Sequence, residues 1–158
     1  MKILFLCTAN SCRSILSEAV FNSMAPTAFK AYSGGSQPKG EVHPLSLKTL
    51  EKAGIATGGL FSESSDVHAE LSPDFVITVC DKAAGEACPV FFGPAVKAHW
   101  GLADPSELEG TTEQIEAAFD HTLAIIRTRV QAFLALPFDR LSPEQLKAEL
   151  ALIGTLGA

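Results

Sequence analysis

The sequence predicts an α/β protein in which helices cover both faces of a mostly parallel β-sheet. Short apolar runs alternate with amphipathic helical segments along the chain, and this alternation is typical of right-handed β–α–β crossovers. The 158 residues are the length of one domain, so residues 1–158 are expected to form a single unit. With 47% hydrophobic and 19% charged residues, intrinsic disorder is excluded.

The first predicted unit is a strand, a loop and a helix. Residues 1–7 form a continuous apolar run that ends in cysteine, which is typical of a strand buried on both faces. Residues 8–14 are polar and predict a loop. Apolar side chains then recur at helical spacing over residues 15–24, until Pro26 closes the segment.

The middle of the chain repeats this alternation. A second strand is expected over residues 29–33, ending at two glycines, and a second helix over residues 44–52, which Gly54 stops. Residues 58–72 show little periodicity and predict a loop with one helical turn near residues 65–71. Residues 74–80 form the clearest buried strand, and it too ends in a cysteine.

A long connection and two helices complete the chain. Residues 81–105 are rich in Gly, Pro and Ala and contain one further predicted strand, residues 95–100. A capping box at Thr111 opens a long amphipathic helix that ends before Pro137. Ser142, followed by Pro143, is a second helix start. Residues 137–158 are therefore expected to form a C-terminal helical extension.

Charge and cysteine content narrow the classes of function. The net charge of −6 disfavours nucleic-acid binding, because no global positive field attracts phosphates. An anion could therefore bind only at a local site formed by backbone N–H groups and an arginine. The N-terminal apolar run is too short for a signal-peptide core and no run approaches the length of a membrane span, so neither is expected. Four cysteines without a secretory signal indicate a reducing compartment, so a cytoplasmic location is expected.

The polar loop after the first strand carries the strongest chemical signal. It fits the pattern Cys, five residues, Arg, then Ser or Thr. A loop between a strand and a helix N-terminus points successive N–H groups inward and forms a nest for a tetrahedral oxyanion. An arginine fork can clamp two oxygens of that anion. The predicted oxyanion-binding residues are Thr8, Ala9, Asn10, Ser11, Cys12, Arg13 and Ser14.

Cys7 lies at the centre of this predicted nest. The groups that hold an oxyanion also stabilise a thiolate, so we expect the pKa of Cys7 to lie below its usual value of about 8.5. Asp104, in an Asp-Pro pair after the strand at 95–100, is placed to protonate a leaving oxygen. The alternative is structural, with Cys7 a buried strand-end residue, Arg13 a helix cap and Asp104-Pro105 an ordinary turn.

The other cysteines and the histidines allow two interpretations. Cys80 and Cys88 do not have the spacing of a zinc site or of a Cys-x-x-Cys redox motif. They can form a relay with Cys7 by thiol–disulfide exchange, or they can be small buried hydrophobic residues. Cys12 is expected to fill space within the loop. His99 is expected to be packed rather than catalytic, and the other histidines to lie on the surface or on helices.

Five segments together resemble one known family. They are Phe-Leu-Cys-Thr-Ala-Asn-Ser-Cys-Arg-Ser (5–14), Tyr-Ser-Gly-Gly (32–35), Val-Ile-Thr-Val-Cys (76–80), Cys-Pro (88–89) and His-Trp-Gly-Leu-Ala-Asp-Pro (99–105). The sequence over residues 1–135 resembles the arsenate reductases built on the low-molecular-weight protein tyrosine phosphatase fold. The resemblance implies a three-layer α/β/α fold with a four-stranded parallel sheet.

The resemblance also implies roles for individual residues. Cys7 would be the nucleophile toward arsenate, for which phosphate or sulfate are analogues, Arg13 the oxyanion clamp and Asp104 the general acid. Cys80 would attack Cys7 and expel arsenite, and Cys88 would then take over the disulfide. No tightly bound cofactor is implied; the reductant would be thioredoxin, or glutathione with glutaredoxin. A potassium ion is implied near the loop, held by Asn10, Glu18, Ser33 and Asp66.

Two departures from the family leave other functions open. The gap between Cys80 and Cys88 is one residue longer than in the best-known thioredoxin-linked members, so either thiol donor remains possible. Ser106 follows the Asp-Pro pair where the phosphatase branch has Tyr, which favours a small inorganic substrate. The alternatives are a phosphatase acting on phosphotyrosine or small phosphoesters through Cys7, Arg13 and Asp104, and a metalloid or oxyanion sensor whose cysteines report redox state.

Overall fold

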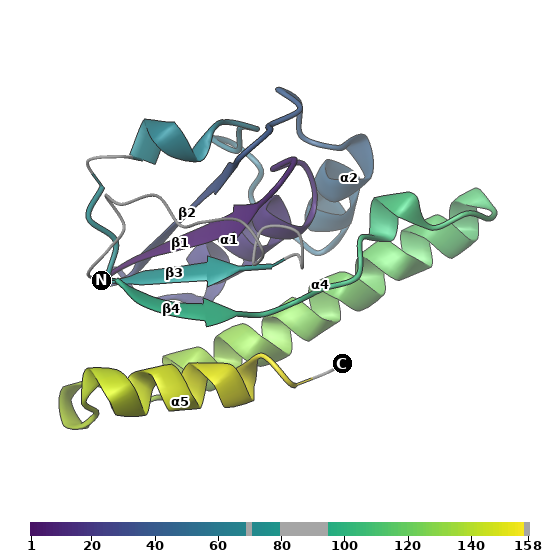
Figure 1. Ribbon diagram of the computed structural model, residues 1–158. Coiled ribbons are helices and arrows are strands. Elements are labelled where there is room, and N and C mark those ends of the chain that lie inside the picture. The colour runs from purple at the N-terminus through teal and green to yellow at the C-terminus, as the bar shows by residue number, and fades with distance from the viewer. Residues whose placement is uncertain (69–70, 80–94, 157–158) are drawn as a thin grey trace.

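The fold is built on one parallel sheet. The computed structural model describes residues 1–68, 71–79 and 95–156, with only the backbone of Asp66 (Figure 1). Four strands lie in the order β2-β1-β3-β4 and all pairs are parallel. Their bounds are β1 Lys2–Cys7, β2 Lys30–Gly35, β3 Phe75–Thr78 and β4 Val96–His99. The predicted α/β class with a four-stranded parallel sheet is therefore confirmed.

The register brings the carboxyl ends of the strands to one edge. Cys7 of β1 pairs with Gly35 of β2, and Leu6 pairs with Thr78 of β3. Thr78 in turn pairs with His99 at the end of β4. In open parallel sheets this edge is where ligands bind. The central position of β1 explains its continuous apolar run, because all side chains from Ile3 to Cys7 are buried.

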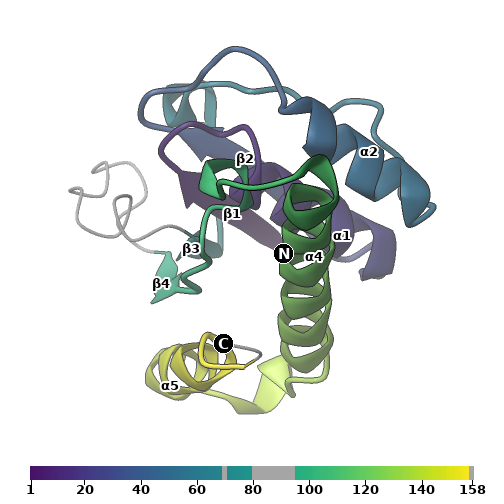
Figure 2. The same cartoon turned by 90° about the vertical axis from the view of Figure 1, so that its right-hand side faces the viewer.

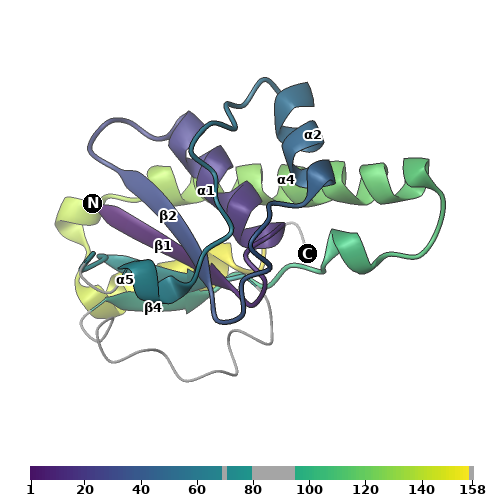
Figure 3. The same cartoon turned by 90° about the horizontal axis from the view of Figure 1, so that it is seen from above.

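Three α-helices lie against one face of the sheet (Figures 2 and 3). They are α1 Arg13–Met24, α2 Pro44–Lys52 and α4 Thr112–Leu134. Phe133, near the end of α4, packs against both α1 and the sheet, with ring centroids 5.5 Å from Phe21 of α1 and 5.2 Å from Phe75 of β3. Edge-on aromatic packing of this kind, with every ring buried, holds the helices at fixed positions above the strands.

The apolar cluster on the opposite face of the sheet is smaller, within the residues that the structure describes. Leu4, Leu6 and Val76 are buried there, packed with Tyr32. The short 3-10 helix η1 Ser65–His68 lies beside β2 on this side, and the His68 ring contacts the Tyr32 ring. Its position confirms the helical turn predicted within residues 58–72.

The predicted helix starts are confirmed by their caps. Thr111 and Gln114 form the capping box of α4, and Ser142 forms the same box with Gln145 at the start of α5 Pro143–Ile153. Two further 3-10 turns, η3 Pro105–Glu107 and η4 Phe138–Arg140, flank α4. Helix α5 lies along β4 at the edge of the sheet (Figure 2).

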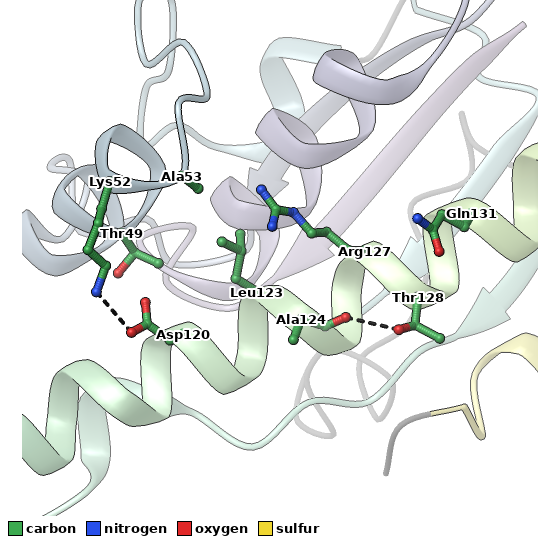
Figure 4. Close-up of a pocket in the computed structure, with 9 residues that line it drawn as sticks. All are labelled: Thr49, Lys52, Ala53, Asp120, Leu123, Ala124, Arg127, Thr128 and Gln131. Carbon is green, nitrogen blue, oxygen red and sulfur yellow. Dashed lines mark hydrogen bonds and ion pairs between the residues drawn. The ribbon is translucent and has the colours of Figure 1, made fainter.

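An open groove lies between α2 and α4 (Figure 4). An ion pair crosses it, with Lys52 Nζ 2.9 Å from Asp120 Oδ2, and Arg127 also lines it. None of the predicted site residues lines this groove. Among the helices that the structure describes, none combines the length and the apolar character needed to cross a bilayer.

Candidate active site

The loop between β1 and α1 directs its carbonyl groups outward. Thr8 O accepts a hydrogen bond from the Gln37 N–H at 2.9 Å, and Ala9 O accepts one from the Lys39 N–H at 3.0 Å. Ser11 O accepts from the N–H of His43 at 3.0 Å and from the Ser46 hydroxyl at 3.0 Å. These partners all lie on the segment between β2 and α2 or at the start of α2.

Outward carbonyls fix the direction of the neighbouring amides. In a trans peptide the N–H points opposite to the carbonyl that precedes it. The N–H groups of Ala9, Asn10 and Cys12 therefore point away from the outer segment and toward the inside of the loop. Inward amides beside the N-terminus of α1 form an anion-binding concavity, so this geometry supports the predicted nest.

Asn10 holds the loop in shape from within. Its side chain is fully buried and its φ is 48°, in the left-handed region that Asn tolerates. Asn10 Nδ2 donates to Ser14 Oγ at 2.7 Å and to Ser33 Oγ at 3.1 Å. Its Oδ1 accepts from the Glu63 N–H at 2.8 Å. The sequence placed Asn10 in the nest but did not predict this bridging role, because its partners Ser33 and Glu63 are distant along the chain.

Gly35 allows β2 to approach the loop closely. A Cβ atom at this position would lie 2.5 Å from Thr8 O, 2.9 Å from Cys7 O and 3.0 Å from Asn10 Cβ. No side chain fits at such distances without moving the loop. The second glycine of the predicted Gly-Gly pair therefore belongs to the site through packing, although it carries no functional group.

Cys7 and Cys12 lie at the two ends of the loop. Cys7, the last residue of β1, is buried with 3% of its surface exposed. Cys12 precedes α1 at its N-cap position and is also buried. Burial raises the pKa of Cys12, against weaker opposing hydrogen bonds from Ser46 and Ser11. Cys12 is therefore held as a neutral thiol, which supports its interpretation as a space-filling residue.

Arg13 joins the loop to the segment after β4. Its Nη1 donates to Leu102 O at 3.1 Å, and its Nη2 lies 3.3 Å from Asp104 Oδ2. Within the described residues, Arg13 Nε is the one buried side-chain nitrogen or oxygen without a hydrogen-bond partner. Buried donors are nearly always paired in folded proteins. The Nε–H of Arg13 is therefore still available to donate a hydrogen bond beside the loop.

Asp104 is oriented by Ser106. Asp104 Oδ1 accepts from the Ser106 N–H at 2.9 Å and from the Ser106 hydroxyl at 2.6 Å, so Asp104 caps η3. The structure therefore brings Cys7, Arg13 and Asp104 to one edge of the sheet. The sequence analysis noted only that Ser106 replaces an aromatic residue and did not predict that it positions Asp104. The Asp-x-Ser spacing, which is typical of an Asx turn, is the sequence signal for this role.

A buried polar network lies behind the loop. Ser33 Oγ donates to Glu18 Oε1 at 2.5 Å, and Ser33 Oγ also accepts from Asn10. Burial raises the pKa of Glu18 to about 7, with Glu63 contributing in the same direction. Three of the four expected potassium ligands thus meet in one network. The side chain of the fourth, Asp66, lies outside the described residues.

Two histidines near the site differ in their burial. The ring of His68 is mostly buried beside the network, with Nε2 2.8 Å from Ser33 O and 3.4 Å from Glu63 Oε1. His99 is exposed, so the expectation that it is packed is wrong. Its Nδ1 lies 2.8 Å from Thr78 Oγ1. Because His99 ends an edge strand, its ring projects to solvent while the next residue, Trp100, is the one that packs.

The predicted Cys80 and Cys88 lie outside the described residues. Val79, the residue before Cys80, donates its N–H to Leu6 O at 2.9 Å. Val79 O in turn accepts from the Leu102 N–H at 3.0 Å. The chain immediately before Cys80 therefore lies between the strand that ends in Cys7 and the segment that carries Asp104.

The fold and the site together define a class of protein. A parallel sheet ends its central strand in a buried cysteine, and a loop of inward amides, an arginine and an aspartate surround that position. This arrangement is that of an α/β protein with a cysteine at the centre of a candidate site for a tetrahedral anion. The chain belongs to the low molecular weight phosphotyrosine protein phosphatase family, which matches residues 2–151.

Several proteins that are similar to this chain are named arsenate reductases. The arsenate reductase of Shouchella clausii (strain KSM-K16) is 34% identical over 134 residues, covering 83% of this chain and 93% of the relative. A solved arsenate reductase in the phosphate binding state is 25% identical with a TM-score of 0.67, covering 85% of this chain and 96% of that one. The thioredoxin-dependent arsenate reductase of Corynebacterium glutamicum is 27% identical with a TM-score of 0.59, covering 82% of this chain and 61% of that one.

Proposed function

We propose that this protein is an arsenate reductase that uses Cys7 as its nucleophile and passes a disulfide through Cys80 to Cys88. The observation that carries the proposal is the loop from Cys7 to Ser14. Its carbonyls point outward, in a chain 34% identical to an arsenate reductase over most of its length. Phosphate binding by a solved relative supports a tetrahedral oxyanion as the ligand of this loop.

The first step is an exchange at arsenic. Arsenate binds with its oxygens on the inward N–H groups, and Arg13 turns from Leu102 O and Asp104 to form a bidentate pair with it. The Cys7 sulfur attacks arsenic and forms an S–As bond. One oxygen leaves as water after taking a proton from Asp104, since hydroxide is a poor leaving group. Arsenic remains As(V) in this adduct.

The second step is the reduction. The Cys80 thiolate attacks the Cys7 sulfur, and the electron pair of the S–As bond passes to arsenic, which leaves as arsenite. Two electrons have moved, and a Cys7–Cys80 disulfide has formed. The Cys88 thiolate then attacks the Cys80 sulfur and releases Cys7 for another cycle. The Val79–Leu6 hydrogen bond supports this order, because it places the chain before Cys80 beside the strand of Cys7.

An external thiol system must reduce the Cys80–Cys88 disulfide. Thioredoxin is the proposed donor, since a relative from Corynebacterium glutamicum is thioredoxin-dependent. Glutathione with glutaredoxin is the second candidate, because of the longer Cys80–Cys88 spacing. Both donors act by thiol–disulfide exchange on an accessible disulfide.

We also propose that a potassium ion stabilises the loop from behind. The fit is supported by Glu18 and Ser33, which supply hard oxygen donors. Asn10 would add a third oxygen by turning its Oδ1 from the Glu63 N–H toward the ion. The fit is supported also by the raised pKa of Glu18, which burial brings to about 7. A cation there would compensate the buried carboxylate, and Asp66 would complete the set. The ion would order the loop and would take no part in bond making.

The proposal is tested by NADPH oxidation with thioredoxin, thioredoxin reductase and arsenate, beside a glutathione–glutaredoxin mixture. Arsenate-dependent oxidation is expected in the thioredoxin mixture and is expected to disappear in Cys7→Ser, Cys80→Ser and Cys88→Ser. Oxidation only with glutaredoxin would keep the reductase and change its donor. Steady p-nitrophenyl phosphate hydrolysis without arsenate-dependent oxidation would instead identify a phosphatase, since Cys7, Arg13 and Asp104 suffice for that reaction.

A further inference from the structure

A buried arginine outside the site holds the segment that leads to Asp104. Arg129 is 1% exposed, on the apolar stripe of α4 next to Val130. Its Nη1 donates to Trp100 O at 3.0 Å and to Gly101 O at 3.1 Å. No carboxylate of the described residues pairs with it. A buried guanidinium is costly unless its donors are satisfied, and backbone carbonyls satisfy it here.

The contacts of Arg129 lead directly into the site. Two residues separate Gly101 from Asp104. One of them, Leu102, donates its N–H to Val79 O and accepts a hydrogen bond from Arg13. The segment 100–104 is therefore held at its start by Arg129 of α4 and at Leu102 by the carbonyl of Val79, an attachment that remains when Arg13 turns toward the anion. The position of the Asp104 carboxyl depends on both attachments, since an aspartate side chain has little reach of its own.

The C-terminal helix takes part in the same support. Trp100 Nε1 donates to Leu150 O of α5 at 2.9 Å, and Arg129 Nε donates to Leu156 O at 3.0 Å. A Cβ at Gly154 would lie 2.6 Å from His99 O and 3.0 Å from Trp100 Cδ1. Figure 2 shows α5 beside β4. The end of β4 is thus held between α4 and the extension.

We propose that Arg129 is a positioning residue for Asp104, and that helix α5 completes a clamp on residues 99–101 that sets where the general acid stands. The inference rests on the proposed function in one respect, since it takes Asp104 as the proton donor. Arg129 donates its hydrogen bonds to the carbonyls of Trp100, Gly101 and Leu156, so we place it behind Asp104 and not against the anion. Its loss therefore impairs the protonation of the leaving oxygen and leaves anion binding by the loop intact.

The test compares Arg129→Met, which keeps the length of the side chain without donors, with Arg129→Lys, which keeps the charge. We expect Arg129→Met to lower kcat about 10- to 100-fold, because misplacing a catalytic group by about 1 Å costs this much. The Kd for inorganic phosphate should stay within about twofold of the wild type, and Arg129→Lys should recover part of kcat. A parallel loss of phosphate binding would overturn the proposal.

A double-mutant cycle separates positioning from general destabilisation. In an Asp104→Asn background, Arg129→Met should cause no further fall in kcat, because the group that it positions is already absent. A further fall of the same size in that background would show that Arg129 acts elsewhere, and would also overturn the proposal.

Gly154→Ala perturbs the clamp from the side of α5 and keeps Arg129. Its φ of −61° and ψ of −13° suit alanine, and the two shortest contacts of the new Cβ are with His99 O and Trp100 Cδ1. We expect kcat to fall severalfold with unchanged phosphate affinity. Leu152→Ala, on an exposed position of the same helix, is the matched control and should behave as the wild type. Equal kcat in both variants would refute the role of α5.

The role of Arg129 in positioning Asp104 can also be tested without measuring arsenate reduction. If the wild type reduces no arsenate, the proposed function fails, and the clamp is then tested by hydrolysis of aryl phosphates. Phenolate needs protonation more than p-nitrophenolate does. Arg129→Met should therefore slow phenyl phosphate hydrolysis more than p-nitrophenyl phosphate hydrolysis, and an equal loss on both esters would contradict the clamp.

Discussion

Replacing Gly35 by alanine should disable the site while the sheet remains folded. The new Cβ would meet Thr8 O at 2.5 Å, whereas ordinary contacts begin at 3.4 Å, so that carbonyl must move by about 0.9 Å. Thr8 O belongs to the peptide whose N–H, on Ala9, points into the nest. A displacement of about 1 Å in a reactive arrangement costs about 100-fold in rate, or about 2.7 kcal/mol in activation free energy.

The assay for this variant is kcat for arsenate reduction together with the Kd for phosphate by calorimetry. Both should worsen, since the amides that bind the anion are displaced. Gly58→Ala is the neutral control, because nothing lies within 4 Å of its Cβ position. In Gly34→Ala the three atoms nearest to the new Cβ all belong to Ser65, the closest at 2.8 Å, so this variant should lower stability more than kcat. A Gly35→Ala protein with wild-type kcat and phosphate affinity would refute the inward-amide account.

Three further predictions concern the surroundings of the loop. Ser106→Ala removes the hydroxyl that holds Asp104 Oδ1 at 2.6 Å; a loss of about 1 kcal/mol in orientation should lower kcat about fivefold, and unchanged kcat would show that the backbone N–H of Ser106 suffices. His43 Nδ1 caps α2 by accepting from the Leu45 N–H, and burial, followed by Lys39, lowers the pKa of His43 below 6.5. As pH falls, His43 is therefore protonated in the unfolded chain before it is protonated in the folded protein, and the stability that the neutral cap contributes is lost below pH 6.5. Between pH 7 and pH 5 the Tm of His43→Asn, which keeps a cap without a titrating group, should fall less than the Tm of the wild type. An equal fall in Tm would contradict the role of the neutral His43. Burial raises the pKa of Cys12, so iodoacetamide at neutral pH should modify Cys7 before Cys12, and peptide mass spectrometry showing the reverse order would contradict the assignment of the nucleophile.

Local patterns in the sequence predicted most of the fold. The apolar run that ends in Cys7 could only be a buried strand, and its central place in the sheet agrees with that. The Thr111 and Ser142 capping boxes marked the starts of α4 and α5, because the cap chemistry lies within four consecutive residues. The spacing of Cys7, Arg13 and Ser14 likewise indicated the oxyanion loop, since all of its residues are contiguous.

Long-range partners could not be predicted in the same way. Asn10 binds Ser33 and Glu63, and no local rule selects these partners among the many polar residues of the chain. Arg129 occupies one position of an amphipathic helix, where a charged residue is normally expected to face solvent. Its burial depends on the carbonyls of Trp100 and Gly101, which become available to it only when β4 and α4 are packed together.

The most direct test of the relay is to stop it after its first disulfide. Cys88→Ser, treated with arsenate in the absence of any thiol donor and quenched with a thiol-alkylating reagent, should release one arsenite per protein and yield a Cys7–Cys80 disulfide in peptide mass spectra. Cys80→Ser, treated in the same way, should release none. If Cys88→Ser released no arsenite and Cys7 and Cys80 were both recovered as alkylated thiols, the relay would be contradicted.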